Sequence, residues 1–147
     1  MIWMPHVTVA AVVEEDERFL LVEEEVEGRR CFNQPAGHWD PGEGLVDAVV
    51  RETLEETGYP FVPESLIGIY HWEHPHKDLT YLRFAFAGRV GARDLGRPLD
   101  TGIIGPQWLS LSQMQAQPGQ MRSALVLRCV EDYLAGQRYP LNILQRL

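Results

Sequence analysis

Residues 37–59 constrain the fold of this chain more than any other stretch, because they predict a rigid loop that runs directly into an acidic helix. The loop, residues 35–44, contains three glycines and two prolines. Such a composition fixes sharp turns and lets a ligand approach the main chain closely. Apolar residues at helical spacing then predict a helix over residues 45–57, which Gly58 and Pro60 end.

Three glutamates share one face of the predicted helix. Glu52, Glu55 and Glu56 are spaced i, i+3 and i+4, so their carboxylates lie close together. Like charges at this spacing repel one another unless a cation lies between them, and carboxylate oxygens favour a hard cation such as Mg²⁺, with Mn²⁺ as the alternative. An isolated acidic triplet is more often a solvated helix face, but the preceding loop favours a metal site.

The other face of this helix predicts a contact with the core. The apolar stripe there comprises Val46, Val49, Val50, Thr53 and Leu54. Leu45 and Ala48 fall nearer the acidic face, so that face is not wholly polar. The preceding loop lacks the closing Gly-Lys-Ser/Thr of a Walker A loop, which excludes that class of phosphate site.

Length and charge limit the classes of protein that fit. The chain has 147 residues, of which 45% are hydrophobic, so we expect a single domain over residues 1–147. Its net charge of −8 disfavours binding to nucleic acid or to an anionic membrane. The two cysteines follow no disulfide pattern and indicate reduced thiols in a cytoplasmic protein. The sequence shows neither a signal peptide at its start nor an apolar run of membrane-spanning length.

The rest of the pattern is mixed α and β. Alternating or apolar runs predict strands over residues 6–13, 19–24, 28–34, 65–72, 79–90 and 107–109, the first two paired as a hairpin. A second helix is predicted over 121–135, a long loop over 91–105, and Ser110 as the N-cap of a short helix. The predicted fold is therefore an α/β/α sandwich with a mixed β-sheet.

Three parts of residues 37–59 resemble the Nudix box, the signature of a superfamily of hydrolases: Gly37, Glu43 and the run Arg51-Glu52-Thr53-Leu54-Glu55-Glu56-Thr57-Gly58. The one departure is Thr53, where the family usually has a bulky aliphatic residue. Segments outside the box resemble the NudJ phosphatase subfamily: residues 5–10, 33–38, 82–84, 122–123 and 136–141. The resemblance spans almost the whole chain and implies the same α/β/α sandwich.

The resemblance also implies roles for individual residues. Glu52, Glu55, Glu56 and the Gly37 carbonyl would bind the divalent metal, and Arg51 would orient a glutamate, with Glu43 as its partner. Some family members use an acid outside the box, often six residues before the strand tryptophan. That position is Gly102 here, so Asp100 is our first candidate for a catalytic base and Glu73 the second. A box glutamate is the alternative.

The implied reaction is hydrolysis of a phosphoanhydride bond. Resemblance to the subfamily implies a small-molecule substrate and orthophosphate release from nucleoside tri- and diphosphates, hydroxymethylpyrimidine diphosphate and thiamine diphosphate. The alternatives are a nucleoside triphosphate pyrophosphatase, an ADP-ribose-type diphosphatase, or a nucleotide sensor without activity. The intact glutamates argue against the sensor, and a monomer or homodimer is expected.

Candidates for substrate binding lie outside the acidic helix. Asn33, Gln34 and His38 flank the loop and predict contacts to a base or pyrimidine, or else to the backbone. Arg83 could hold phosphate or form a structural pair. Gln137 and Arg138 follow the last helix and either close over substrate or tie down the C-terminus. His71, His74 and His76 are expected in a solvated loop rather than at substrate or metal.

Overall fold

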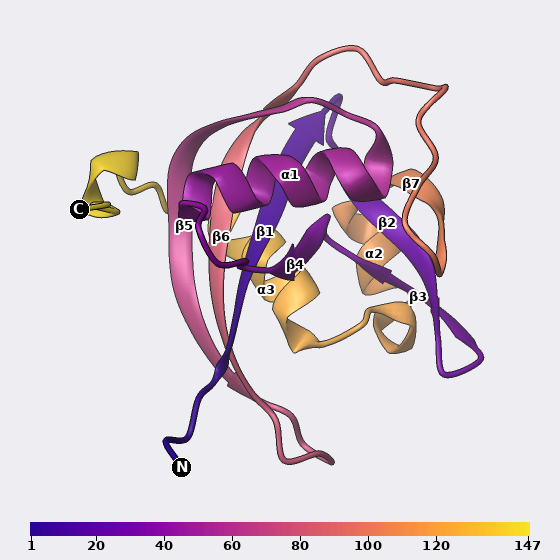
Figure 1. Cartoon of the computed structure of the whole chain (residues 1–147). Helices are drawn as coiled ribbons and strands as arrows, with labels where there is room; N and C mark the ends of the chain where they lie inside the picture. The colour runs from indigo at the N-terminus through magenta and orange to yellow at the C-terminus, as the bar shows by residue number, and fades with distance from the viewer.

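The central element of the fold is a long strand, β1 (His6–Glu15), as the computed structural model of residues 1–147 shows (Figure 1). β1 pairs in parallel with β6 (Thr80–Val90) and antiparallel with the short β4 (Ala36–His38). β5 (Phe61–Glu73) pairs antiparallel with β6 at the edge. This mixed pairing confirms the expected sheet type.

A second group of strands branches from the end of β1. β2 (Arg18–Val26) pairs with β1 only beside the turn, at Glu14 and Glu15, and then diverges. It continues between β3 (Arg29–Asn33) and β7 (Ile103–Ser110), giving a seven-stranded sheet in all. The predicted hairpin is therefore present, but its strands serve two different parts of the sheet.

Helices cover both faces of the sheet. α1 (Leu45–Thr57) lies on one face and α3 (Ala124–Leu134) on the other, with the short α2 (Leu111–Gln115) beside α3 (Figure 1). Alternation along β1 explains the two cores: Val9, Ala11 and Val13 belong to the cluster under α1, and Val12 to the cluster under α3. The α/β/α sandwich is thereby confirmed. None of the helices is both long and apolar enough to cross a membrane.

The buried arc of α1 differs from the predicted stripe. Ala48, Val49 and Thr53 are fully buried, whereas Val46 and Leu54 are only partly so. Glu52, which we expect on the acidic face, is 9% exposed. The reason is that β4 packs against the helix and extends its buried arc to Glu52.

Element bounds differ from prediction where long-range pairing decides them. β4 lies inside the predicted loop, β5 begins at Phe61 and β7 at Ile103. The last helix begins at Ala124, because Ser123 caps it by accepting a hydrogen bond from the Leu125 N–H. The prediction for Ser110 is confirmed: it caps α2 through a capping box with Gln113. Two single turns of 3₁₀ helix complete the chain, at Pro118–Gln120 and Leu141–Ile143.

Candidate active site

The floor of the site is β4, which lies between β1 and helix α1. Gly37 stands opposite Val9 of β1, and a methyl group at Gly37 would collide with the carboxylate of Glu52. The neighbouring Ala36 N–H donates to Oε1 of Glu56 at 2.9 Å. The loop therefore contacts two of the three helix glutamates, and any side chain at residue 37 would require Glu52 to move.

Arg51 connects the loop to the helix face. Its Nε and Nη2 donate to the two carboxylate oxygens of Glu43 at 3.0 and 2.8 Å, the pairing expected from the sequence. Its Nη1 donates to Glu52 at 2.8 Å and to Glu55 at 3.2 Å. Nη2 also reaches the His38 carbonyl at 3.0 Å. One guanidinium thus fixes the relative positions of three carboxylates.

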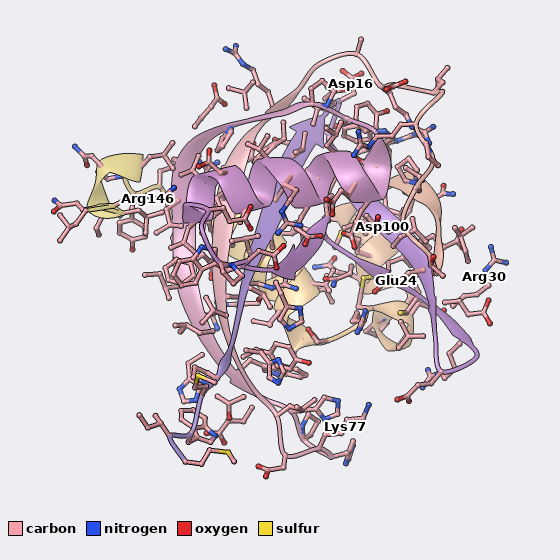
Figure 2. The ribbon with its side chains drawn as sticks, viewed as in Figure 1. Asp16, Glu24, Arg30, Lys77, Asp100 and Arg146 are labelled. Atoms are coloured by element: carbon pink, nitrogen blue, oxygen red, sulfur yellow. The ribbon has the colours of Figure 1, made fainter.

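A group of three carboxylates could hold a cation. Oxygens of Glu52, Glu55 and Asp100 all lie within 4.8 Å of one another. Asp100 comes from the loop between β6 and β7, and its N–H donates to the Glu55 carbonyl at 3.3 Å. Figure 2 shows Asp100 beside helix α1. Oxygen-only donors at this spacing fit a hard divalent cation. Glu56 is not in this group of three, since it accepts from Ala36 instead.

Burial disfavours full ionisation of the glutamates in this site. Burial raises the pKa of Glu52, although Arg51 opposes the change. Burial also raises the pKa of Glu56 to about 8, with the Ala36 N–H lowering it and the charges of Glu52, Glu24 and Asp100 adding to the increase. By contrast, the hydrogen bond from Arg51 lowers the pKa of Glu43. A proton or a cation is therefore needed to neutralise the buried glutamates.

A cavity of about 570 Å³ adjoins β4. Ala36, Gly37 and His38 form its wall nearest the acids, and the tip of the β5–β6 hairpin, with Lys77, forms its far end (Figure 2). Ala36 and Gly37 therefore contribute to both the carboxylate cluster and the cavity. This volume is typical of a small-molecule site.

Four predicted substrate residues lie at or beside this cavity. Asn33, His38 and Arg83 line it. Gln34 is 1% exposed and bridges the Val126 carbonyl, at 2.7 Å, to Arg83 Nη1, at 2.9 Å. Gln34 therefore has the backbone-satisfying contact that we weighed as an alternative, and Arg83 forms a structural pair while it also lines the cavity.

His38 pairs with a second histidine. Its Nε2 lies 3.1 Å from Nδ1 of His6, and burial, with His6 next, lowers the pKa of His38. The two rings meet edge to face, 5.3 Å apart. A neutral His38 can either donate or accept a hydrogen bond at the cavity wall.

Other predicted site residues lie apart. Arg138 stacks on Tyr133 and donates to the Tyr133 and Gln137 carbonyls, and neither Gln137 nor Arg138 lines the cavity. These contacts fit the alternative that the segment ties down the C-terminus. Glu73 pairs with His71 at 3.3 Å and is absent from the carboxylate group.

Sequence reasoning missed several cavity residues. His74 and His76, assigned to a solvated loop, line the cavity together with Trp72, Tyr81 and Arg122. Trp72 lies near the end of β5 and His74 just follows that strand, but only the register of β5 with β6 brings Trp72 opposite Tyr81. Glu24 and Arg122 are 98 residues apart and form an ion pair, with no local signal that could have predicted it.

Known proteins resemble this chain in both sequence and fold. Residues 4–128 match the family model described as NUDIX domain. The chain is 41% identical to "Phosphatase NudJ" of Escherichia coli (strain K12) over 140 residues, which cover 95% of this chain and 90% of that protein. A NUDIX hydrolase structure from Nitrosomonas europaea has a TM-score of 0.96, 52% identity and 98% coverage of each chain. A MutT structure from Methanosarcina mazei, at 22% identity and TM-score 0.73, shares the fold over 94% of this chain and 100% of that one. This chain belongs to the Nudix hydrolase family.

Proposed function

We propose that this Nudix hydrolase is a Mg²⁺-dependent enzyme that releases orthophosphate from nucleoside tri- and diphosphates and from thiamine-related pyrophosphates. The observation that carries the proposal is the convergence of Glu52, Glu55 and Asp100 within 4.8 Å, beside a cavity of about 570 Å³. Similarity to the phosphatase NudJ of E. coli supports the choice of product. A cytoplasmic location and a monomeric or homodimeric state stay predictions from the sequence.

The proposed metal ligands are Glu52, Glu55 and Glu56 with the Gly37 carbonyl, and Asp100 is close enough to join them. The bound cation would neutralise phosphate oxygens, lower the pKa of a water and align its attack on phosphorus. An acidic protein of net charge −8 needs such a positive charge to hold a polyanion beside its own carboxylates.

The protein itself contributes position and proton transfer. Arg51 keeps Glu52 and Glu55 in fixed orientations through hydrogen bonds of 2.8 and 3.2 Å. Asp100 and Glu56 are the two candidates for the base that takes a proton from the attacking water. In the metal-free protein, burial raises the pKa of Glu56 to about 8, so its carboxyl binds a proton more tightly than an ordinary glutamate does.

Product analysis tests the proposal most directly. Cytidine triphosphate should yield the diphosphate first and the monophosphate next, with one orthophosphate at each step, in an ion-exchange time course free of contaminating pyrophosphatase. Direct formation of monophosphate and pyrophosphate would instead indicate a nucleoside triphosphate pyrophosphatase. Hydroxymethylpyrimidine diphosphate and thiamine diphosphate belong in the same panel, because they test the second substrate group.

A further inference from the structure

Aromatic rings from β5, β6 and the connection between these strands line the cavity. Trp72 of β5 stands opposite Tyr81 of β6, and their ring centroids are 5.7 Å apart at an interplanar angle of 40°. His74 lies 5.3 Å beyond Trp72, and His6 lies 5.3 Å from Tyr81 on the side toward His38. Trp72, Tyr81 and His74 all line the cavity. Flat aromatic walls of this kind are suited to stacking against a planar ring.

The hairpin that carries these rings is internally fixed. The N–H groups of His76 and Lys77 both donate to Nδ1 of His74 at 3.1 Å, so this nitrogen accepts and Nε2 carries the proton. Lys77 also pairs with Glu27 of the β2–β3 turn at 2.8 Å. The ion pair connects the hairpin to the opposite side of the cavity.

A chain of hydrogen bonds orients one further polar group in the cavity. The Val126 carbonyl accepts from Gln34, Gln34 Oε1 accepts from Arg83 Nη1, and Asn33 Oδ1 accepts from Arg83 Nη2 at 3.1 Å. Because an arginine only donates, Asn33 must turn its oxygen toward Arg83 and its NH₂ group away. Arg83 is 5% exposed and Gln34 1%, so the chain is held within the protein.

The amide of Asn33 is consequently an unused donor at the cavity wall. Asn33 Nδ2 donates to no protein atom. Asn33 Nδ2 is not among the enclosed side-chain atoms that lack a partner, so it retains accessible surface, and Asn33 lines the cavity. A donor fixed at a stacking wall is the arrangement that recognises an acceptor on the edge of a heterocycle.

We infer that this cavity is a subsite for an aromatic heterocycle, in which Trp72 and Tyr81 stack on the ring and Asn33 Nδ2 donates to a ring oxygen or nitrogen. Gln34 and Arg83 are positioning residues that act through Asn33. The inference rests on the proposed function in one respect: the heterocycle must carry a phosphoanhydride that extends to the carboxylate cluster. Substrate selection would then come from the ring subsite, because the carboxylate cluster recognises only the phosphates.

The test separates ring recognition from hydrolysis by using paired ligands with and without a ring. Calorimetric titration in Mg²⁺ compares cytidine α,β-methylene diphosphate with methylenediphosphonate, neither of which contains a hydrolysable anhydride. Trp72→Leu should weaken binding of the cytidine ligand about tenfold, the usual loss of affinity when a stacking side chain is removed. Binding of methylenediphosphonate should be unchanged. Trp3→Leu is the matched control, because Trp3 is 70% exposed near the N-terminus and does not line the cavity.

Asn33→Asp provides a second variant that keeps the contact with Arg83 but replaces the NH₂ donor by an acceptor oxygen. It should weaken binding of the cytidine ligand about fivefold more than binding of methylenediphosphonate. The comparison with methylenediphosphonate corrects for the added negative charge. Equal losses for both ligands, in either variant, would overturn the ring subsite. Hydrolysis of cytidine triphosphate and of inorganic tripolyphosphate is followed separately. If neither is cleaved, the proposed function fails, while the binding comparison still decides the ring subsite.

Discussion

Glu56 gives the most direct test of the site at the scale of a single residue. The change Glu56→Gln keeps the shape of the side chain but removes its charge, so turnover should fall by about 10²-fold or more if Glu56 is a ligand or base. Thermal stability without metal should not fall at pH 8, because the amide removes a carboxylate that is costly to bury. Steady-state phosphate release and melting temperature measure the two effects. Near-parental turnover in both Glu56→Gln and Glu55→Gln would contradict the assignment.

The same residue predicts how stability depends on pH in protein freed of metal. The Glu56 carboxyl has a pKa of about 8 in the folded state, against an ordinary 4.5. Between these values the folded state binds more protons than the unfolded state, so the free energy of unfolding falls as pH rises from 5 toward 8. Glu56→Gln should flatten this slope. Denaturant titrations at several pH values measure it, and equal slopes in parent and variant would refute the prediction.

Few of the residue contacts could be predicted from the sequence. The Arg51–Glu43 pair was expected because both residues belong to the box, and it is present at 2.8 Å. Asp100 is the first candidate for the acid that the family often has at the position of Gly102. The loop does bring Asp100 to Glu52 and Glu55. The chain from Val126 through Gln34 and Arg83 to Asn33 was not predictable, since it joins a helix, a loop and two strands.

At the scale of elements, strand β4 holds the loop against helix α1 and leaves no free space for a side chain at residue 37. In Gly37→Ala the added methyl group would overlap the Glu52 carboxylate, so one of the two must move. We expect turnover to fall by about 10²-fold, because displacing a metal ligand disturbs the positioning of the water. Gly96→Ala is the control, since its nearest neighbour would be an Asp94 side-chain oxygen at 3.6 Å. Comparable turnover in the two variants would show that the tight approach is unimportant.

Helix α1 was predicted with its observed bounds, because its apolar period and Gly58 are local signals. Strand β4 was not predicted, because three residues in a segment rich in glycine and proline carry no local strand pattern. Its position depends on pairing with Thr8, Val9 and Ala10, which lie far away in the sequence. The same dependence on register explains why the aromatic wall of Trp72 and Tyr81 was missed.

At the scale of the whole molecule, metal should control both activity and stability. Excess EDTA should abolish turnover, and Mg²⁺ or Mn²⁺ should restore it, because the donors are oxygens alone. A ligand that binds only the folded state at about 100 times its dissociation constant adds about 2.7 kcal/mol to the free energy of unfolding. Thermal melts with and without Mg²⁺ measure this gain, which should be smaller in Glu56→Gln. Full activity in excess EDTA would be incompatible with the mechanism.

The shared wall of β4 has a consequence for substrate length. Ala36 and Gly37 contact the helix glutamates and also line the cavity, so β4 fixes the distance between the proposed ring subsite and the carboxylate cluster. A triphosphate and the diphosphate formed from it differ in length by one phosphate, so stepwise release of orthophosphate requires the longer substrate to fold or its ring to shift. Substrates with one carbon or a whole ribose between ring and phosphate would differ in length in the same way. Thus turnover would depend on the distance between ring and terminal phosphorus, and a series of linkers of increasing length would measure that dependence.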